Sequence, residues 1–340
     1  MVTQALKTNM QPNKKKHAMA TNRNDVRAKA APEQSSHKQA VNALIGIDPE
    51  AVFRQAVALF ARIGFKGARA TLLSVVEPVN LTMPIPSGAN LSPIFDMVDE
   101  QVARKWRTEQ AEIALASAGK QLLDQGIAVK KELRSGFAPG ELLKFADEMK
   151  ANLLVAACTH HGALSSALLG SVSRAAVIGA GQSILLARHD LPEGKPLTAV
   201  LATDHSDYCN EGINQLIAFH PTGIRKITVL SALGTGFLKD TSLIPNLSAF
   251  SEEEENWREQ TLRVKTEEVC DQLWKVRVRA EPMMVKMSPQ EAINHAMKKS
   301  GADLLIMSAH GHGFLERAMI GSLSLHEAVA ENYSILILRP

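Results

Sequence analysis

The chain repeats itself, and this internal repeat constrains its fold more than any other feature of the sequence. In each copy a short apolar run ends in an acid, Asp48 in the first and Asp204 in the second. A helix start of the form Pro-x-Glu follows at Pro139 and again at Pro289, and a Gly-Ser pair follows at 170–171 and again at 321–322. Landmarks that recur in one order at nearly constant spacing indicate two homologous domains in tandem.

Each copy alternates short apolar, strand-like runs with helical segments, which is typical of a parallel sheet covered by helices. We therefore predict an α/β fold of two tandem open parallel-sheet, Rossmann-like domains with five strands each. The expected strands lie near 41–47, 69–76, 127–134, 152–157 and 183–187, then near 197–202, 225–231, 276–286, 303–308 and 334–338. Long helices are expected over 96–125 and 252–275.

The domain boundaries follow from composition and charge. With 340 residues, 45% of them hydrophobic, the chain can bury two cores, which we place at 39–190 and 196–340. Residues 1–38 carry eight Lys and Arg against two acids, so we expect a disordered basic tail. The remaining chain is mildly acidic and lacks the footprint of a nucleic-acid-binding fold.

Several classes of protein are disfavoured by what the sequence lacks. No apolar run approaches the ~20 residues that a membrane helix requires, and no secretory leader is recognisable. The three cysteines, Cys158, Cys209 and Cys270, are too widely spaced for a disulfide framework or a zinc knuckle. We expect a cytoplasmic protein with buried, unreactive thiols. The three tryptophans fall in helical stretches and are expected to be packing residues.

A candidate binding site lies where the strand order of an open parallel sheet reverses, beyond the carboxyl ends of the strands. Asp204 closes the first strand of the second copy, and the loop after the fourth strand runs Ser308-Ala309-His310-Gly311, nine residues, then Gly321-Ser322. Glycines let the backbone approach an anion, and a Gly-Ser pair at a helix start offers N–H groups and a hydroxyl. The spacing predicts a polyphosphate site in which Asp204 accepts hydrogen bonds from a ribose or an adenine.

This loop, together with 302–308 and the closing strand 334–338, resembles the C-terminal signature of universal stress proteins. Their ATP-binding branch carries Gly, two residues, Gly, nine residues, Gly and then Ser or Thr. The resemblance extends over about 40–340 and implies an adenine-nucleotide-hydrolase-like fold with ATP, accompanied by Mg²⁺, as ligand. Another branch of the family lacks the glycines and does not bind ATP.

The resemblance also implies roles for particular residues. Asp204 and Ala232 correspond to positions beside the adenosine, and His310 is expected to orient the loop or to lie near phosphate. Gly311, Gly321 and Ser322 correspond to phosphate-cradling positions, whereas Ser308 stands where the first glycine should be. In the first copy the corresponding residues are Asp48, Val75, Gly162, Gly170 and Ser171.

The first copy departs further from the pattern. Thr159 replaces its first glycine, and only seven residues separate Gly162 from Gly170. Two missing residues can displace the loop by up to ~7 Å, far more than a hydrogen bond to phosphate tolerates. We therefore expect the second domain to be the main nucleotide site and the first to support it.

Other chemistries find less support. His160, His161, His310 and His312 lie in the matching loops, but no carboxylate or cysteine stands beside them at ligand spacing, so no metal site is expected. The sequence contains no G-x-S-x-G elbow, no Walker motif and no G-x-G-x-x-G after a strand. Catalytic residues are therefore not assigned.

The sequence thus favours an ATP-binding stress-response regulator. Two alternatives stay open: a scaffold or interaction module that has lost the nucleotide, and a slow ATPase or autophosphorylating protein with Ser322 as acceptor. The two domains are expected to pair as an internal pseudo-dimer, and whether whole chains form a homodimer is left open.

Overall fold

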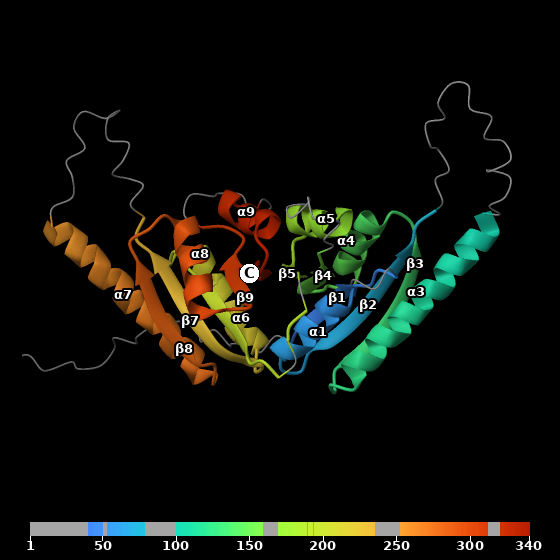
Figure 1. Ribbon diagram of the computed structural model, residues 1–340, viewed down its shortest axis with the longest axis horizontal. Helices are drawn as coiled ribbons and strands as arrows, with labels where there is room; N and C mark the ends of the chain where they lie inside the picture. The colour runs from blue at the N-terminus through green and yellow to red at the C-terminus, as the bar shows by residue number, and fades with distance from the viewer. Residues whose placement is uncertain are drawn as a thin grey trace, which may run out of the picture. The chain divides into compact units, whose positions relative to one another are not determined.

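One ten-stranded sheet runs through both halves of the chain (Figure 1). The computed structural model describes residues 40–49, 53–78, 100–158, 169–188, 190–192, 194–234, 252–311 and 320–340. The strand order is β3-β2-β1-β4-β5-β10-β9-β6-β7-β8, so each half contributes five strands in the same internal order. The predicted α/β fold class is confirmed. The basic tail at 1–38 lies outside the described residues.

The helices and strands alternate along the chain as the sequence pattern indicates. The first half contains β1 Asn42–Gly46, α1 Phe53–Ile63, β2 Arg69–Val76, α3 Glu100–Leu123, β3 Ala128–Ser135, α4 Ala138–Glu148, β4 Leu153–Ala157, α5 Ser171–Gly179 and β5 Ser183–Ala187. The second half contains β6 Leu197–Ala202, α6 Asp207–Phe219, β7 Ile224–Ala232, α7 Glu252–Lys275, β8 Ala280–Val285, α8 Pro289–Ser300, β9 Leu304–Ser308, α9 Ser322–Ala330 and β10 Ser334–Leu338.

Only the start of β8 differs clearly from the expected strands. The strand begins at Ala280 rather than near 276, because Val276 and Arg277 form the turn that ends α7. Arg277 has a φ of +64°, a left-handed conformation that a strand residue does not adopt. The apolar pattern therefore predicts too long a strand here, because apolar residues such as Val276 also occur in the turn.

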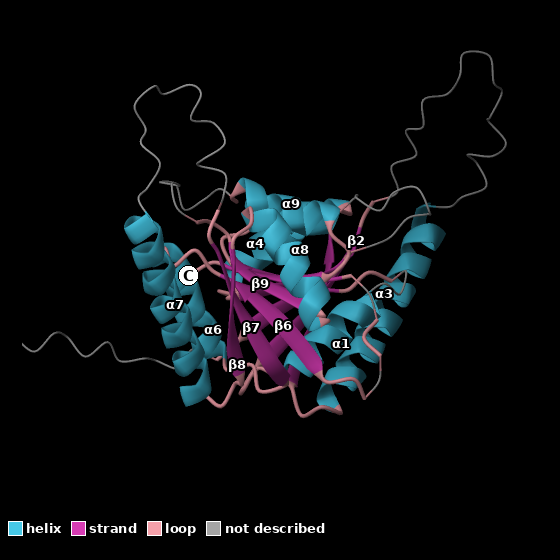
Figure 2. Cartoon of the chain, turned by 60° about the vertical axis from the view of Figure 1, so that its left-hand side comes forward, coloured by secondary structure: helices cyan, strands magenta, loops and turns pink. Residues whose placement is uncertain are grey.

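Helices cover both faces of the sheet (Figure 2). The helices α1, α3, α6 and α7 pack on one face, and α4, α5, α8 and α9 pack on the other. Since successive strand residues point to opposite faces, Ala43 and Ile45 join one hydrophobic core while Leu44 joins the other. Burial on both faces explains why the central strands are continuously apolar rather than alternating.

The two halves meet where β5 and β10 pair antiparallel, with Ile335 opposite Leu186. Two buried arginines at equivalent positions of the repeat each donate hydrogen bonds across this junction to the other half. Arg339 donates from Nη2 to the Val177 carbonyl at the end of α5, at 2.7 Å, and Arg188 donates to the Ala328 carbonyl at the end of α9. The expected internal pairing of the two halves is thereby confirmed, as one continuous sheet.

A second junction joins the turn after α1 to the turn after α6. The Gly223 N–H donates to the Ile63 carbonyl at 2.9 Å. A Cβ at Gly223 would lie 1.9 Å from the Arg62 carbonyl oxygen, so only glycine fits there. The ring of Phe65 lies 5.8 Å from that of Phe219 across the same junction.

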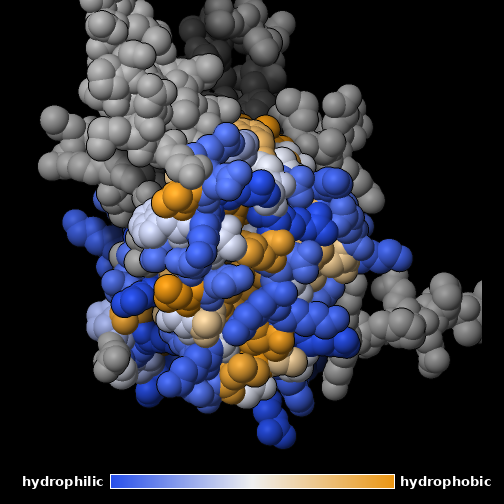
Figure 3. Space-filling view, turned by 90° about the vertical axis from the view of Figure 1, so that its right-hand side faces the viewer, coloured by the Kyte–Doolittle hydropathy of each residue, from blue (hydrophilic) through white to orange (hydrophobic). Residues whose placement is uncertain are grey.

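The long helices α3 and α7 expose large hydrophobic side chains. Trp106 is 60% exposed and Trp257 is 69% exposed, so the expectation that the tryptophans are packing residues is wrong. Hydrophobic side chains lie among hydrophilic ones on the side of the molecule that carries α3 (Figure 3). The buried face of α3 instead combines small residues (Ala111, Ala114 and Ala118) with Leu115 and Leu122.

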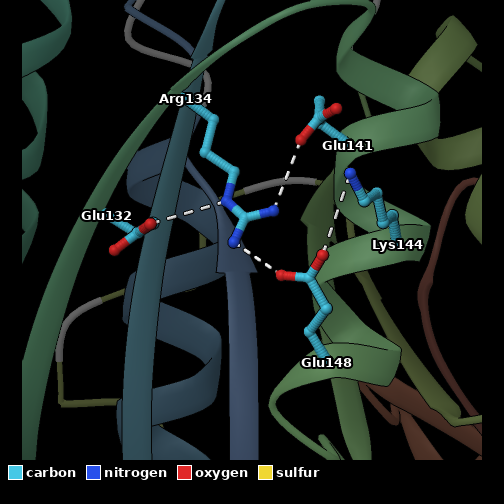
Figure 4. Close-up of polar contacts among 5 residues, drawn as sticks. All are labelled: Glu132, Arg134, Glu141, Lys144 and Glu148. Atoms are coloured by element: carbon cyan, nitrogen blue, oxygen red, sulfur yellow. Dashed lines mark hydrogen bonds and ion pairs between the residues drawn. The ribbon is translucent and has the colours of Figure 1, made fainter.

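An ion cluster fastens β3 to α4 (Figure 4). The guanidinium of Arg134 lies 2.6 Å from a Glu148 carboxylate oxygen, 3.4 Å from Glu141 and 3.5 Å from Glu132. It also stacks over the Phe145 ring, 4.0 Å from the ring centroid. The cluster holds an edge strand against the helix that follows it.

Candidate functional site

A cavity of about 300 Å³ opens at the carboxyl ends of β6, β7 and β9 in the second half. This is the point where the strand order reverses, with β7 on one side of β6 and β9 on the other. All seven residues expected for the second-half site line it: Asp204, Ala232, Ser308, His310, Gly311, Gly321 and Ser322. The fold therefore brings together residues more than 110 positions apart in the chain.

Asp204 lies against Gly311 in the lining of this cavity. A Cβ at Gly311 would lie 2.4 Å from Asp204 Oδ2, closer than any side chain could approach. The other carboxylate oxygen, Oδ1, accepts a hydrogen bond from the Ser206 N–H at 3.0 Å. Any larger residue at 311 would therefore force the Asp204 carboxylate to move, because the backbone of the loop lies directly against it.

A buried polar network positions the turn that carries Asp204. His205 adopts a φ of +57°, and its Nε2 lies 2.9 Å from Ser231 Oγ and 3.2 Å from Thr266 Oγ1. Its backbone N–H donates to Thr203 Oγ1 at 3.0 Å. Sequence reasoning missed these residues, because the hydroxyls come from β7 and α7 and no local spacing connects them.

Helix α9 begins at the cavity with its first turn uncapped by a side chain. Gly321 is the N-cap residue and offers no capping hydroxyl. Its N–H donates to the Ala309 carbonyl at 2.8 Å, and a Cβ there would lie 3.1 Å from that oxygen. The adjacent Ser324 Oγ donates to the Ser308 carbonyl at 3.0 Å, which fixes α9 on the end of β9. The positive end of the helix dipole therefore faces the cavity.

Ser308 is accommodated by a glycine that sequence reasoning did not single out. The Ser308 side chain is almost fully buried, and a Cβ at Gly212 in α6 would lie 2.4 Å from its Oγ. The hydroxyl consequently packs against the α6 backbone. Gly212 on the neighbouring helix α6 therefore leaves room for the serine that stands in place of the expected glycine.

The rest of the lining is mainly apolar. Leu230, Ile293, Met307 and Leu323 contribute side chains, and His310 packs edge-to-face on Tyr208 with 5.0 Å between the ring centroids. Burial raises the pKa of the Cys209 thiol to about 11, so this lining group is neutral at pH 7. Asp204 is the one carboxylate in the described lining, which contains no Lys or Arg.

A larger cavity, about 650 Å³, occupies the matching place in the first half. Its lining includes four of the expected residues: Asp48, Val75, Gly170 and Ser171. The fifth expected residue, Gly162, lies outside the described residues, as do the loop histidines His160, His161 and His312.

The first-half cavity differs in its polar groups. Trp106 and Arg107 of α3 enter its lining, together with Glu77. The Arg107 Nη1 donates to the Glu77 carbonyl at 3.1 Å, and Glu77 Oε1 accepts from the Ala138 N–H at the start of α4. The two cavities are thus equivalent in position and unlike in charge.

The sequence model of the universal stress protein family matches residues 44–188 and 198–331. The chain belongs to the universal stress protein family. The two matched segments correspond to the two halves of the sheet, so it is a tandem two-domain member.

Solved structures of universal stress proteins share this fold. A universal stress protein from Archaeoglobus fulgidus is 16% identical, with a TM-score of 0.58 over 89% of this chain and 100% of that one. A functionally unknown protein from Pseudomonas aeruginosa is 14% identical, with a TM-score of 0.51 over 89% and 94% of the two chains. No curated protein matches the chain. None of the described helices is long and apolar enough to span a bilayer.

One group of side chains in this family member has metal-ligand chemistry outside the cavities. His326, Glu327 and Glu331, at the end of α9, bring ligand atoms within 4.8 Å of one another. Glu327 is fully buried, its Oε2 accepts a hydrogen bond from the Tyr333 hydroxyl, and burial raises its pKa.

Proposed function

We propose that this universal stress protein binds Mg-ATP in the second-half cavity and acts in the stress response as a nucleotide-dependent regulator. The observation that supports it best is the contact of Asp204 with Gly311 at the topological switch point. The carboxylate would accept hydrogen bonds from ribose or adenine, and the apolar lining would hold the base.

The phosphates would lie between the glycine loop and the start of α9. The uncapped first turn offers N–H groups and the Ser322 hydroxyl. Since the described lining contains no Lys or Arg, Mg²⁺ would balance the triphosphate charge. The first-half cavity is proposed as the weaker site, because only seven residues separate Gly162 from Gly170 and because Glu77 adds a second carboxylate to its lining.

Slow hydrolysis is a second candidate function. It would use the same bound ATP, and autophosphorylation would use Ser322. The titratable side chains of the described lining are Asp204, Cys209 and His310; the Cys209 thiol is held neutral, and Asp204 and His310 are proposed to hold the nucleotide rather than to activate water. Binding and regulation therefore account for the cavity better than turnover does.

Calorimetric titration of Mg-ATP tests the proposal. Gly311→Ala is expected to weaken binding at least tenfold, because its Cβ would displace the Asp204 carboxylate. Asp204→Asn tests the carboxylate itself. Gly234→Ala is the matched control, since a Cβ there meets no atom within 4 Å.

Each outcome of the titration decides between functions. One site that is lost in Gly311→Ala and kept in the control supports binding by the second half. Two sites of equal affinity would contradict the weaker role of the first half. No heat from folded wild-type protein would overturn nucleotide binding and leave the scaffold alternative, whereas phosphate release during the titration would favour the slow ATPase.

A further inference from the structure

The outward faces of α3 and α7 each carry a pair of exposed apolar side chains. Trp106 and Ile113 form the pair on α3, and Trp257 and Val264 form the pair on α7; all four are more than half exposed, and Trp106 also borders the first-half cavity. Seven residues are nearly two helical turns, so each pair lies along one face of its helix. We name these pairs the α3 stripe and the α7 stripe.

The two stripes occupy equivalent positions in the repeat. Trp257 follows Trp106 by 151 residues, and Val264 follows Ile113 by the same interval. The buried faces keep this register, since Leu122 and Leu273 are also 151 residues apart and both are 0% exposed. Single exposed apolar residues are ordinary, but the same exposed pair on both copies is an organised feature.

The stripes lie at the two ends of the sheet. Helix α3 packs on β2 and β3, and α7 packs on β7 and β8, while β3 and β8 are the two outermost strands. The β5–β10 junction between the halves lies at the middle of the strand order. Internal pairing of the halves therefore leaves both stripes uncovered.

The two helices differ in charge. Helix α3 has four basic and three acidic residues, whereas α7 has four basic and eight acidic residues. Close to the stripes, the exposed Lys120 of α3 corresponds to the exposed Asp271 of α7, again 151 residues on. One end of the molecule is thus apolar and weakly basic, and the other is apolar and acidic.

We propose that the α3 stripe of one copy docks on the α7 stripe of a second copy. Pairing α7 with α7 would oppose two acidic helices, whereas pairing α3 with α7 joins opposite charges around aromatic side chains, which are enriched in interface cores. A contact between two different surfaces leaves one end free on each partner, so it generates chains or closed rings.

Sedimentation velocity tests this contact with two complementary variants. Trp106→Asp disables the α3 stripe and Trp257→Lys disables the α7 stripe, each by placing on one helix the charge that the other helix carries. Wild-type protein is expected to associate increasingly with concentration, and each variant alone is expected to stay monomeric. A mixture of the two is expected to form one-to-one dimers and nothing larger, because one intact α3 stripe and one intact α7 stripe remain.

Ile178→Ser is the matched control, because this residue is 54% exposed on α5, away from both stripes, and should leave association unchanged. Circular dichroism checks that all variants are folded. Wild-type protein that is monomeric at every concentration would overturn the proposal, and so would a mixture that stays monomeric. If Trp257→Lys alone still associates, the contact is between identical surfaces and the head-to-tail arrangement is wrong.

Discussion

Two close backbone contacts of this chain depend on glycine, which has a hydrogen atom in place of Cβ. At Gly311 the missing Cβ lets the loop lie against Asp204, and at Gly223 it lets one half lie against the other. Neither residue is among those with a left-handed φ, so close approach rather than backbone conformation accounts for glycine at both positions, against backbone at 223 and against a side chain at 311. Substitution at 311 therefore tests nucleotide binding, and substitution at 223 tests the stability of the fold.

Gly223→Ala is expected to destabilise the fold, because its Cβ would lie 1.9 Å from the Arg62 carbonyl oxygen. Overpacking of this kind costs about 1–3 kcal/mol of unfolding free energy. Urea denaturation measures it, with Gly181→Ala as control, since a Cβ at 181 meets no atom within 4 Å. Equal stability of the two variants would contradict the close contact between the turns.

The buried thiols should respond to alkaline pH. Burial raises the pKa values of Cys209 and Cys270 from an ordinary 9.0 to about 11. Between pH 9 and about 11 the unfolded chain would lose these protons while the native chain keeps them, so the unfolding free energy should fall as pH rises.

A thiol reagent at pH 8 measures the same effect. The cysteines should react slowly in native protein and fast after denaturation, because only the thiolate is nucleophilic. Fast reaction of native protein would show that the thiols are not held in the protonated form.

At the scale of the element, helix starts and strand edges are held by different means. Ser288 and Glu291 form the expected capping box at the start of α8, with both reciprocal hydrogen bonds present. The equivalent helix α4 has Phe137 at its N-cap with no side-chain cap, and Glu77 supplies an acceptor to Ala138 instead. The repeat keeps the helices while their ends are satisfied by different residues.

The Arg134 cluster is expected to stabilise β3 in a pH-dependent way. The hydrogen bond from Arg134 lowers the pKa of Glu148, so this stabilisation is present above the unfolded carboxyl pKa and is lost as pH falls through the lowered value. Arg134→Met should therefore lower the melting temperature by a few degrees near pH 7 and by less near pH 3. Calorimetric melting curves across this range measure it, and a constant difference at all pH values would assign the effect to packing on Phe145.

At the scale of the whole molecule, two arginines tie each half to a helix of the other. Arg188 and Arg339 are both buried, and each donates to carbonyl oxygens at the end of α9 or α5 across the β5–β10 junction. Reciprocal contacts of this kind make separate unfolding of either half costly, because buried carbonyls would lose their donors.

Arg339→Met should uncouple the halves. The Val177 and Ala180 carbonyls would lose their donor, at a cost of about 1–3 kcal/mol per buried group left unsatisfied. Differential scanning calorimetry should show one transition for wild type and a lower or split transition for the variant. Wild-type protein that melts in two steps would contradict strong coupling through these arginines.

The fold and most of the second-half site could be predicted from the sequence. Apolar periodicity and the repeat were sufficient for the strands, and Asp204, Gly311, Gly321 and Ser322 were found because site residues of parallel sheets follow strand ends. The same reasoning gave the wrong orientation for Trp106 and Trp257, since small residues such as Ala114 cover the opposite face of the helix. Hydrophobic periodicity predicts that a helix has two different faces. It does not always predict which of the two faces is buried.

The sequence by itself determined the two halves, the positions of their strands and the residues at their strand ends, because these follow from local patterns repeated along the chain. Only the tertiary structure decided that Gly212 makes room for Ser308, that Ser231 and Thr266 support His205, and that Arg339 reaches across to α5. These contacts join residues far apart in the sequence, and no local spacing encodes which distant groups will meet when the sheet closes.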